Sequence, residues 1–224
     1  MRILLLPGMD GTGELFTYLL KYLHDFEIEV IPLPQDTKQD YETLITYIKA
    51  RIPTEDFALV AESFSGALAA KLTLENIPNL KKIVFVATFL SPPSPTLLGL
   101  AEHLPLKTLS KLPFAKYTLK QLFYGNDASP DLIDLFDEIL NKLPENVLND
   151  RITTMKNLTF SARSIEVPSI YIQASSDKVV PRDKFNEFKA HFNNIELVEV
   201  EGPHFILQNK PEECANAIIK HVSS

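Results

Sequence analysis

The chain has 224 residues, of which 45% are hydrophobic and 23% are charged, values that are ordinary for one soluble globular domain with a proper core. Its formal net charge is −7, and no cluster of Lys and Arg stands out along the sequence. This argues against nucleic acid or an anionic membrane as the main partner, because both require a concentrated basic surface.

The single cysteine, Cys214, allows no intrachain disulfide. A reducing compartment fits this, although a protein without disulfides can also be secreted. The mostly apolar segment of residues 1–6 is too short for the hydrophobic region of a signal peptide and runs directly into Pro7 and Gly8. No segment approaches the roughly twenty apolar residues that span a bilayer. We therefore expect a cytoplasmic protein without stable membrane insertion.

Short apolar runs alternate with helical patterns along the chain. Strands are predicted at residues 3–6, 27–31, 57–61, 82–87, 169–174 and 196–200. Helices are predicted at residues 14–23, 41–48, 66–74, 181–191 and 211–221. The alternation indicates the α/β class, with a mostly parallel six-stranded sheet covered by helices on both faces.

Residues 91–160 break this alternation, because they contain candidate helices and no convincing strand. Ser129 followed by Pro130 is typical of the start of a helix. We predict that residues 91–160 form a helical cap over the sheet, and that residues 1–90 and 161–224 form the core. The alternative is that these helices simply extend the core.

Glycines follow three of the predicted strands. Five of the 7 glycines are Gly8, Gly11 and Gly13 after the first strand, Gly66 after the third, and Gly202 after the last. Glycine is used where the backbone takes positive φ or passes close to another group. Glycines also mark ordinary turns, but these five lie at the edge where open α/β sheets bind ligands. They indicate a site at the carboxyl ends of the strands.

Ser63 lies where the third predicted strand runs into a helix, in the sequence VAESFSG at residues 60–66. The segment resembles the nucleophile elbow of α/β-hydrolases, G-x-S-x-G, with Ala61 and Ser65 at the two glycine positions and Gly66 one place later. The elbow requires small residues because its nucleophile sits in a strained turn. We predict Ser63 as the nucleophile. Ser65 is the alternative, but it would move the turn into the helix.

Two further loops resemble the acid loop and the terminal His loop of the same family. Asp177 follows the fifth strand, and His204 follows the sixth. The chain order Ser, Asp, His is the one that this family uses. In such a triad the imidazole takes the serine proton, and the carboxylate orients the imidazole. The alternatives are that Asp177 only caps the next helix and that His204 is a structural loop histidine.

The resemblance also implies an oxyanion hole made of two backbone N–H groups. One belongs to Phe64, the residue after the nucleophile. The other belongs by position to Met9, in the loop after the first strand. We expect Gly8 to free the backbone of that loop to turn, and Gly66 to allow close packing at the elbow. Asp10 stabilises the turn or caps the following helix or, in the alternative, takes part directly in chemistry.

The resemblance covers almost the whole chain. The first strand matches the third strand of the family, so the two leading antiparallel strands of the family are not expected here. Members of the family nearly always work without a metal or organic cofactor. Neither a metal-ligand cluster nor a phosphate-binding loop appears in the sequence. We therefore expect no cofactor and no metal.

These features lead to the expectation of a serine hydrolase that cleaves a small-molecule carboxylic ester through an acyl-enzyme. An acyltransferase or thioesterase with the same triad is the main alternative, and a non-catalytic ligand-binding protein on the same fold is another. The cap predicts an apolar acyl pocket, although its residues could also be ordinary core. The predicted pocket residues are Leu97, Leu100, Leu104, Phe114, Leu122 and Phe123.

Overall fold

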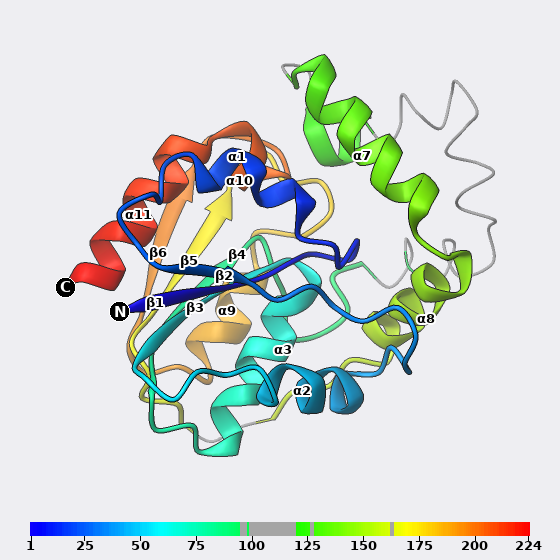
Figure 1. The fold of residues 1–224 in the computed structure, drawn as a ribbon. Coiled ribbons are helices and arrows are strands. Elements are labelled where there is room, and N and C mark those ends of the chain that lie inside the picture. Colours follow the sequence, from blue (N-terminus) through cyan, green and yellow to red (C-terminus); the bar gives the residue numbers. More distant parts are fainter. Residues whose placement is uncertain (95–97, 99–119, 126–127, 162–163) are drawn as a thin grey trace.

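The computed structural model describes residues 1–94, 98, 120–125, 128–161 and 164–224. Its centre is a six-stranded sheet of parallel strands in the order β2-β1-β3-β4-β5-β6 (Figure 1). The predicted α/β class and the parallel six-stranded sheet are confirmed, and no strand end differs from its predicted position by more than two residues. The strands are β1 (Arg2–Leu6), β2 (Ile28–Val30), β3 (Phe57–Glu62), β4 (Leu80–Val86), β5 (Ser169–Ala174) and β6 (Ile195–Val200).

Two inner strands, β3 and β5, are buried along their whole length. Every residue of β3 and of β5 is buried, whereas the edge strand β6 keeps only Val200 buried. A parallel sheet that is covered on both faces excludes water from its inner strands, so these strands consist almost entirely of apolar residues instead of alternating with polar ones. This is why the short apolar runs in the sequence predicted the strands well.

Helices cover both faces of the sheet (Figure 1). Alternate side chains of one strand, such as Ile3 and Leu4 of β1, belong to separate apolar clusters on opposite faces. The helices on the first face are α1 (Thr17–Leu20), α10 (Ile206–Asn209) and α11 (Pro211–Ser223). Those on the second face are α2 (Tyr41–Lys49), α3 (Phe64–Leu72) and α9 (Lys184–Lys189).

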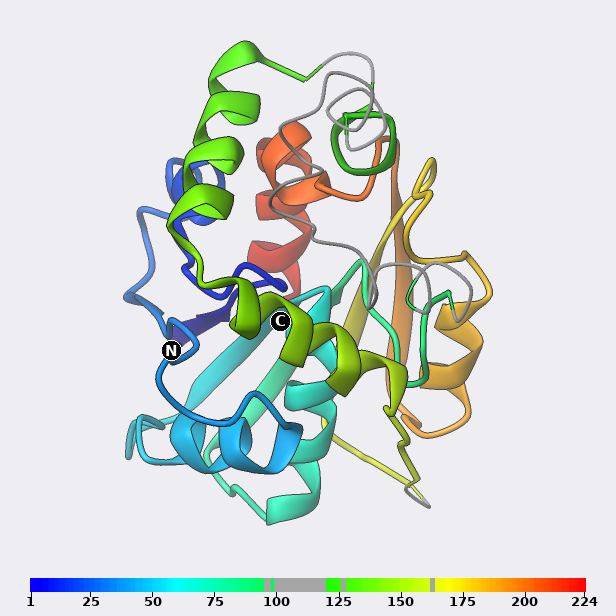
Figure 2. The ribbon, with the colours of Figure 1, turned by 90° about the vertical axis from the view of Figure 1, so that its right-hand side faces the viewer.

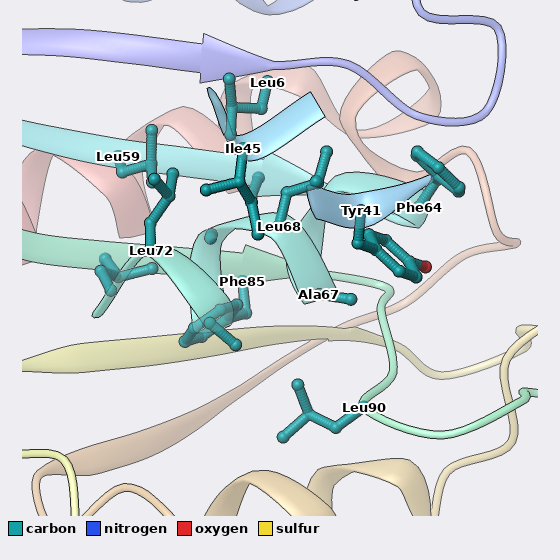
Figure 3. Packing of buried hydrophobic residues seen from close by; sticks show 14 of the residues in the cluster. Leu6, Tyr41, Ile45, Leu59, Phe64, Ala67, Leu68, Leu72, Phe85 and Leu90 are labelled. Carbon is teal, nitrogen blue, oxygen red and sulfur yellow. The ribbon is translucent and has the colours of Figure 1, made fainter. Parts of the chain in front are cut away.

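The second face holds the helix that follows Ser63. Figure 3 shows Leu59 and Phe85 of the sheet beside Leu68 and other side chains of α3. At the start of α3, the ring of Phe64 stacks on Tyr41 of α2, with centroids 5.2 Å apart. This contact joins the first turn of α3 to the start of α2.

Three predicted helices differ clearly in their extent from the prediction. Residues 14–23 form a 3₁₀ turn, η1 (Glu14–Phe16), and then the short α1. The helix predicted over residues 181–191 begins only at Lys184, because Pro181 belongs to a preceding turn in which Lys184 N donates to Pro181 O at 3.1 Å. The helix predicted over residues 66–74 begins at Phe64 and ends in a second 3₁₀ turn, η2 (Thr73–Glu75).

The described part of the insertion is helical and lies beyond the carboxyl ends of the strands (Figures 1 and 2). Ser129 caps the helix that begins at Pro130, as predicted, since the Oγ of Ser129 accepts from Leu132 N at 3.2 Å. Phe136 of that helix packs on Phe205, in the loop after β6. The division of the chain into a core and a cap stays a prediction. The helices are η3 (Lys120–Tyr124), a π-helical turn, α7 (Pro130–Lys142) and α8 (Glu145–Lys156).

None of the helices in the described part of the chain is long and apolar enough to cross a membrane.

Candidate active site

Ser63 occupies a strained turn between β3 and α3. Its φ of 49° and ψ of −113° lie in a region that non-glycine residues rarely adopt. Three hydrogen bonds hold the turn: Ser63 N donates to Val86 O at 2.9 Å, Gly66 N donates to Ser63 O at 3.0 Å, and Thr88 Oγ1 donates to Ser63 O at 2.5 Å. Such strain persists only where the surroundings fix it, and it is concentrated at functional sites.

Two small residues after Ser63, Ser65 and Gly66, each lie in a tightly packed position. A Cβ added at Gly66 would lie 2.0 Å from Thr88 Oγ1, so no larger residue fits there without displacing Thr88. The side chain of Ser65 is fully buried, and its hydroxyl donates to the carbonyl of Pro7. Ser65, the alternative nucleophile, is therefore engaged in a structural contact away from His204.

The structure brings together Ser63, His204 and Asp177, which lie after β3, β6 and β5. The Oγ of Ser63 lies 3.1 Å from Nε2 of His204, and Nδ1 of His204 lies 2.8 Å from Oδ2 of Asp177. Because a carboxylate only accepts, the ring proton belongs on Nδ1, which leaves Nε2 free to accept from the Ser63 hydroxyl. The side chains of His204 and Asp177 are each 3% exposed.

Asp177 uses its two carboxylate oxygens for different contacts. While Oδ2 meets His204, Oδ1 accepts from the backbone N–H groups of Val179 and Val180, both at 2.8 Å. Asp177 does not cap the next helix, which begins at Lys184. The turn instead locks the carboxylate in position, and Ser176 N donates to Gly202 O at 2.9 Å to tie the acid loop to the His loop.

The charges around His204 favour its protonated form. Burial acts to lower the pKa of the imidazole, but the charge of Asp177, the hydrogen bond that His204 donates to Asp177 and the charge of Glu62 together raise the pKa above its ordinary value. Such an environment stabilises the imidazolium that forms when the ring takes a proton from a serine hydroxyl.

Glu62 is a buried carboxyl group next to the elbow, with only 4% of the residue exposed. Burial raises its pKa to about 7, the hydrogen bond from Gln208 and the charge of His204 oppose the rise, and the charge of Asp10 adds to it. Gln208 Nε2 donates to Glu62 Oε1 at 3.0 Å. Glu62 therefore titrates near neutrality within the charge network of His204.

The loop after β1 passes directly beside Ser63. A Cβ added at Gly8 would lie 3.7 Å from the Cβ of Ser63. Strand β1 lies between β2 and β3 in the sheet. From β1 the chain continues to β2 at one edge of the sheet, whereas from β3 it continues to β4 in the opposite direction. Ligands of open α/β sheets bind at such a switch point.

Gly11 N donates to Gly8 O at 3.1 Å in the turn of this loop, and the expectation that Gly8 frees the backbone to turn stays a prediction. The positive φ angles are at Gly11 (72°) and Gly13 (79°). Asp10 is buried, and its Oδ2 accepts from Thr12 N at 2.9 Å and from Thr12 Oγ1 at 2.6 Å. Asp10 thus stabilises the turn, one of the roles expected for it. The assignment of Met9 N–H as an oxyanion donor stays a prediction.

Two of the six predicted pocket residues, Leu122 and Phe123, lie in η3 and are partly buried. The ring of Phe123 meets the imidazole of His204 edge to face, with centroids 5.7 Å apart, and Phe123 O accepts from Phe205 N at 2.9 Å. The insertion therefore contributes a side chain next to His204. The other predicted pocket residues lie outside the described residues: Leu97, Leu100, Leu104 and Phe114.

Four polar residues at the site were not singled out in the sequence: Glu62, Thr88, Arg151 and Gln208. Glu62 carried a usable signal, because it is a carboxylate at the end of an otherwise apolar strand. The other three carry none, since each reaches the site from a separate part of the chain. Their partners follow only from the tertiary contacts.

The model of the family described as "Serine aminopeptidase, S33" matches residues 29–202, well over half of the chain. The chain belongs to this family of α/β-hydrolases. The matched part of the S33 fold includes Ser63 and Asp177 and ends just before His204. Membership makes the protein a hydrolase, as the resemblance had implied. The sequence has no significant match among curated proteins.

Solved structures similar to this S33 member include esterases and a thioesterase of low sequence identity. An esterase from Exiguobacterium antarcticum has a TM-score of 0.84 at 13% identity, over 100% of this chain and 92% of that chain. A lipase-esterase related protein from Clostridium acetobutylicum has a TM-score of 0.80 at 18% identity, over 98% of this chain and 93% of that chain. A thioesterase of the prodiginine pathway in Streptomyces coelicolor has a TM-score of 0.70 at 18% identity, over 98% of this chain and 85% of that chain. At these identities, the likeness shows the shared fold.

Proposed function

We propose that the protein cleaves a small-molecule carboxylic ester through an acyl-enzyme intermediate, with Ser63 as nucleophile. The observation that carries the proposal is the pair of contacts from Ser63 Oγ to His204 Nε2 (3.1 Å) and from His204 Nδ1 to Asp177 Oδ2 (2.8 Å). A serine hydroxyl is a weak nucleophile until a neighbouring base takes its proton, and a carboxylate keeps that base in the required tautomer.

The proposed reaction has two halves. Ser63 Oγ attacks the ester carbonyl carbon while His204 Nε2 takes the hydroxyl proton, which gives a tetrahedral oxyanion. The oxyanion collapses as the bond to the leaving oxygen breaks, and His204 returns the proton to that oxygen. Water then attacks the acyl-enzyme with His204 as base, and the carboxylic acid leaves Ser63 with its proton restored.

In this proposal the oxyanion accepts from the N–H groups of Phe64 and Met9. Phe64 is the first residue of α3, and the first N–H groups of a helix have no partner within the helix. The loop that carries Met9 runs beside Ser63, as the position of Gly8 indicates. Two fixed donors at a developing negative charge supply a large part of the rate enhancement in acyl transfer.

The direct test is turnover of p-nitrophenyl esters of increasing acyl length by the wild type and by Ser63→Ala. The substitution is expected to lower kcat by roughly 10⁴-fold or more while the melting temperature changes little. A fluorophosphonate probe should label the wild type and Ser65→Ala, but not Ser63→Ala. Turnover by Ser63→Ala at the wild-type rate would remove the mechanism. A probe adduct mapped to residue 65 would relocate the nucleophile.

A second candidate uses the same three side chains on a thioester, or transfers the acyl group to an alcohol or thiol. Its support is the likeness to the Streptomyces coelicolor thioesterase. Matched oxygen esters and thioesters of one acyl group, each assayed with and without alcohol acceptors, separate these activities by kcat/KM and by product partition. A non-catalytic ligand-binding role predicts no turnover and no fluorophosphonate label at all.

A further inference from the structure

Arg151 of α8 is a fully buried cation close to the proposed oxyanion hole. Its exposure is 0%, although Arg is among the residues least often buried. Burial lowers the pKa of its guanidinium to about 10, against the charge of Asp10, which raises it, so the group is charged at neutral pH. A buried charge is tolerated only when its hydrogen-bonding groups find partners.

The guanidinium of Arg151 binds three acceptors from two loops of the core. Nη1 donates to Met9 O at 2.7 Å, in the loop after β1. Nε donates to Gln39 Oε1 at 2.8 Å, and Nη2 donates to Pro34 O at 3.2 Å, both in the loop that leads into α2. One planar cation from the insertion therefore joins the loop of Met9 to the loop before α2.

The surrounding loops are shaped around the guanidinium. Gly11 has a positive φ of 72°, and a Cβ added there would lie 2.3 Å from Nη1 of Arg151. The side chain of Gln39 is itself fixed, because its Nε2 donates to Pro34 O at 3.0 Å and to Thr37 O at 2.7 Å. The loop after β1 has to be free of a side chain at Gly11 for Arg151 to reach Met9.

Two anchored peptide groups flank the one that carries the Met9 N–H. The carbonyl of the Pro7–Gly8 peptide accepts from the Ser65 hydroxyl, and the carbonyl of the Met9–Asp10 peptide accepts from Arg151. The Gly8–Met9 peptide lies between them. Because a peptide group is planar, fixing the peptides on both sides restricts the direction of the N–H between them.

We propose that Arg151 is a positioning residue for catalysis, which aims the N–H of Met9 at the oxyanion by holding the carbonyl of the same residue. The inference rests on the proposed function, since it requires an oxyanion at Ser63. It also makes the oxyanion hole dependent on α8, so that the insertion and the catalytic loop have to dock together.

The test compares Arg151→Met and Arg151→Lys with the wild type on an oxygen ester and on the corresponding thionoester. Sulfur is larger and accepts hydrogen bonds more weakly than oxygen, so the ratio of the two kcat/KM values reports how well the backbone donors are placed. Ile152→Ala is the matched control, because Ile152 lies in the same helix, is buried in the apolar core and takes no part in the contacts of Arg151.

We expect Arg151→Met to lower kcat for the oxygen ester by roughly 100-fold, as misplacement of a catalytic group by about 1 Å does, with a smaller effect on KM. The ratio of oxygen ester to thionoester should fall at least about tenfold in both Arg151 variants. Ile152→Ala should lower the melting temperature and leave the ratio at its wild-type value. Methylguanidinium added to Arg151→Ala should restore part of kcat.

A wild-type ratio in both Arg151 variants would overturn the inference. If Arg151→Met does not fold, as judged by circular dichroism, Arg151→Lys decides alone, because an ammonium group cannot hold Met9, Gln39 and Pro34 with one planar fork. A fall of the ratio in Ile152→Ala equal to that in the Arg151 variants would also overturn it, since the effect would then belong to the docking of α8. Failure of the proposed function looks different, because the wild type itself would then turn over neither ester.

Discussion

The carboxyl group of Glu62 lies against the side-chain amide of Gln208, whose Nε2 donates to Oε1 at 3.0 Å. Both side chains are buried, and Gln208 Oε1 has no hydrogen-bond partner within the described part of the protein. A neutral carboxylic acid has an O–H that could donate to such an acceptor, whereas a carboxylate has none. Burial raises the pKa of Glu62 to about 7 against the hydrogen bond from Gln208, which lowers it, so the group is partly ionised at neutral pH.

Ionisation of Glu62 is expected to destabilise the fold. The pKa of Glu62 is about 7 in the folded protein, whereas its ordinary value of 4.5 applies to the unfolded chain. The folded state therefore holds the proton more tightly than the unfolded state. Stability is then fully present below pH 4.5 and is lost progressively as the pH rises toward 7. The loss is on the order of 3 kcal/mol, since one pKa unit corresponds to about 1.4 kcal/mol.

Glu62→Gln tests this dependence, because the amide is neutral at every pH. The unfolding free energy of the wild type should fall, relative to that of Glu62→Gln, between pH 5 and pH 8, as measured by urea denaturation. Parallel profiles for the two proteins over this range would show that Glu62 is ionised in both the folded and the unfolded states.

The same substitution should shift the pH dependence of activity. His204 acts as a base only when neutral, so activity should rise with pH through its pKa. The charge of Glu62 contributes to the raised pKa of His204, so its removal lowers that pKa. The acidic limb of kcat/KM is expected to move to lower pH in Glu62→Gln. An unchanged or upward-shifted limb would mean that Glu62 does not act on the imidazole.

Asp177→Asn should abolish most activity with little change in structure. The new side-chain oxygen can still accept from Val179 N and Val180 N, as Oδ1 does now. Its NH₂ group, however, would donate to Nδ1 of His204 and so move the ring proton to Nε2, which could then no longer accept from Ser63. We expect kcat to fall roughly 10⁴-fold, as in other Ser-His-Asp triads, with a melting temperature close to the wild type. Activity within tenfold of the wild type would contradict the assigned role.

Local patterns in the sequence were enough to predict the layout of the core. The apolar runs predicted every strand, and the inner strands β3 and β5 are the most apolar because a doubly covered parallel sheet excludes water from both of their faces. The small residues around Ser63, and the acid and His that follow later strands, were sufficient to predict which side chains meet. The carboxyl ends of parallel strands lie at one edge of the sheet, so residues far apart in the chain converge there without any further information.

The sequence by itself determined the fold class, the strand positions and the three side chains at the carboxyl edge, because each depends on local periodicity or on a short motif. Only the tertiary structure decided how the loops at that edge are held. Arg151 meets Met9 across 142 positions of sequence, and Gln208 meets Glu62 across 146. A buried polar group binds whichever partner the packed chain brings within about 3 Å. That choice depends on the packing of whole elements, and no local pattern of residues encodes it.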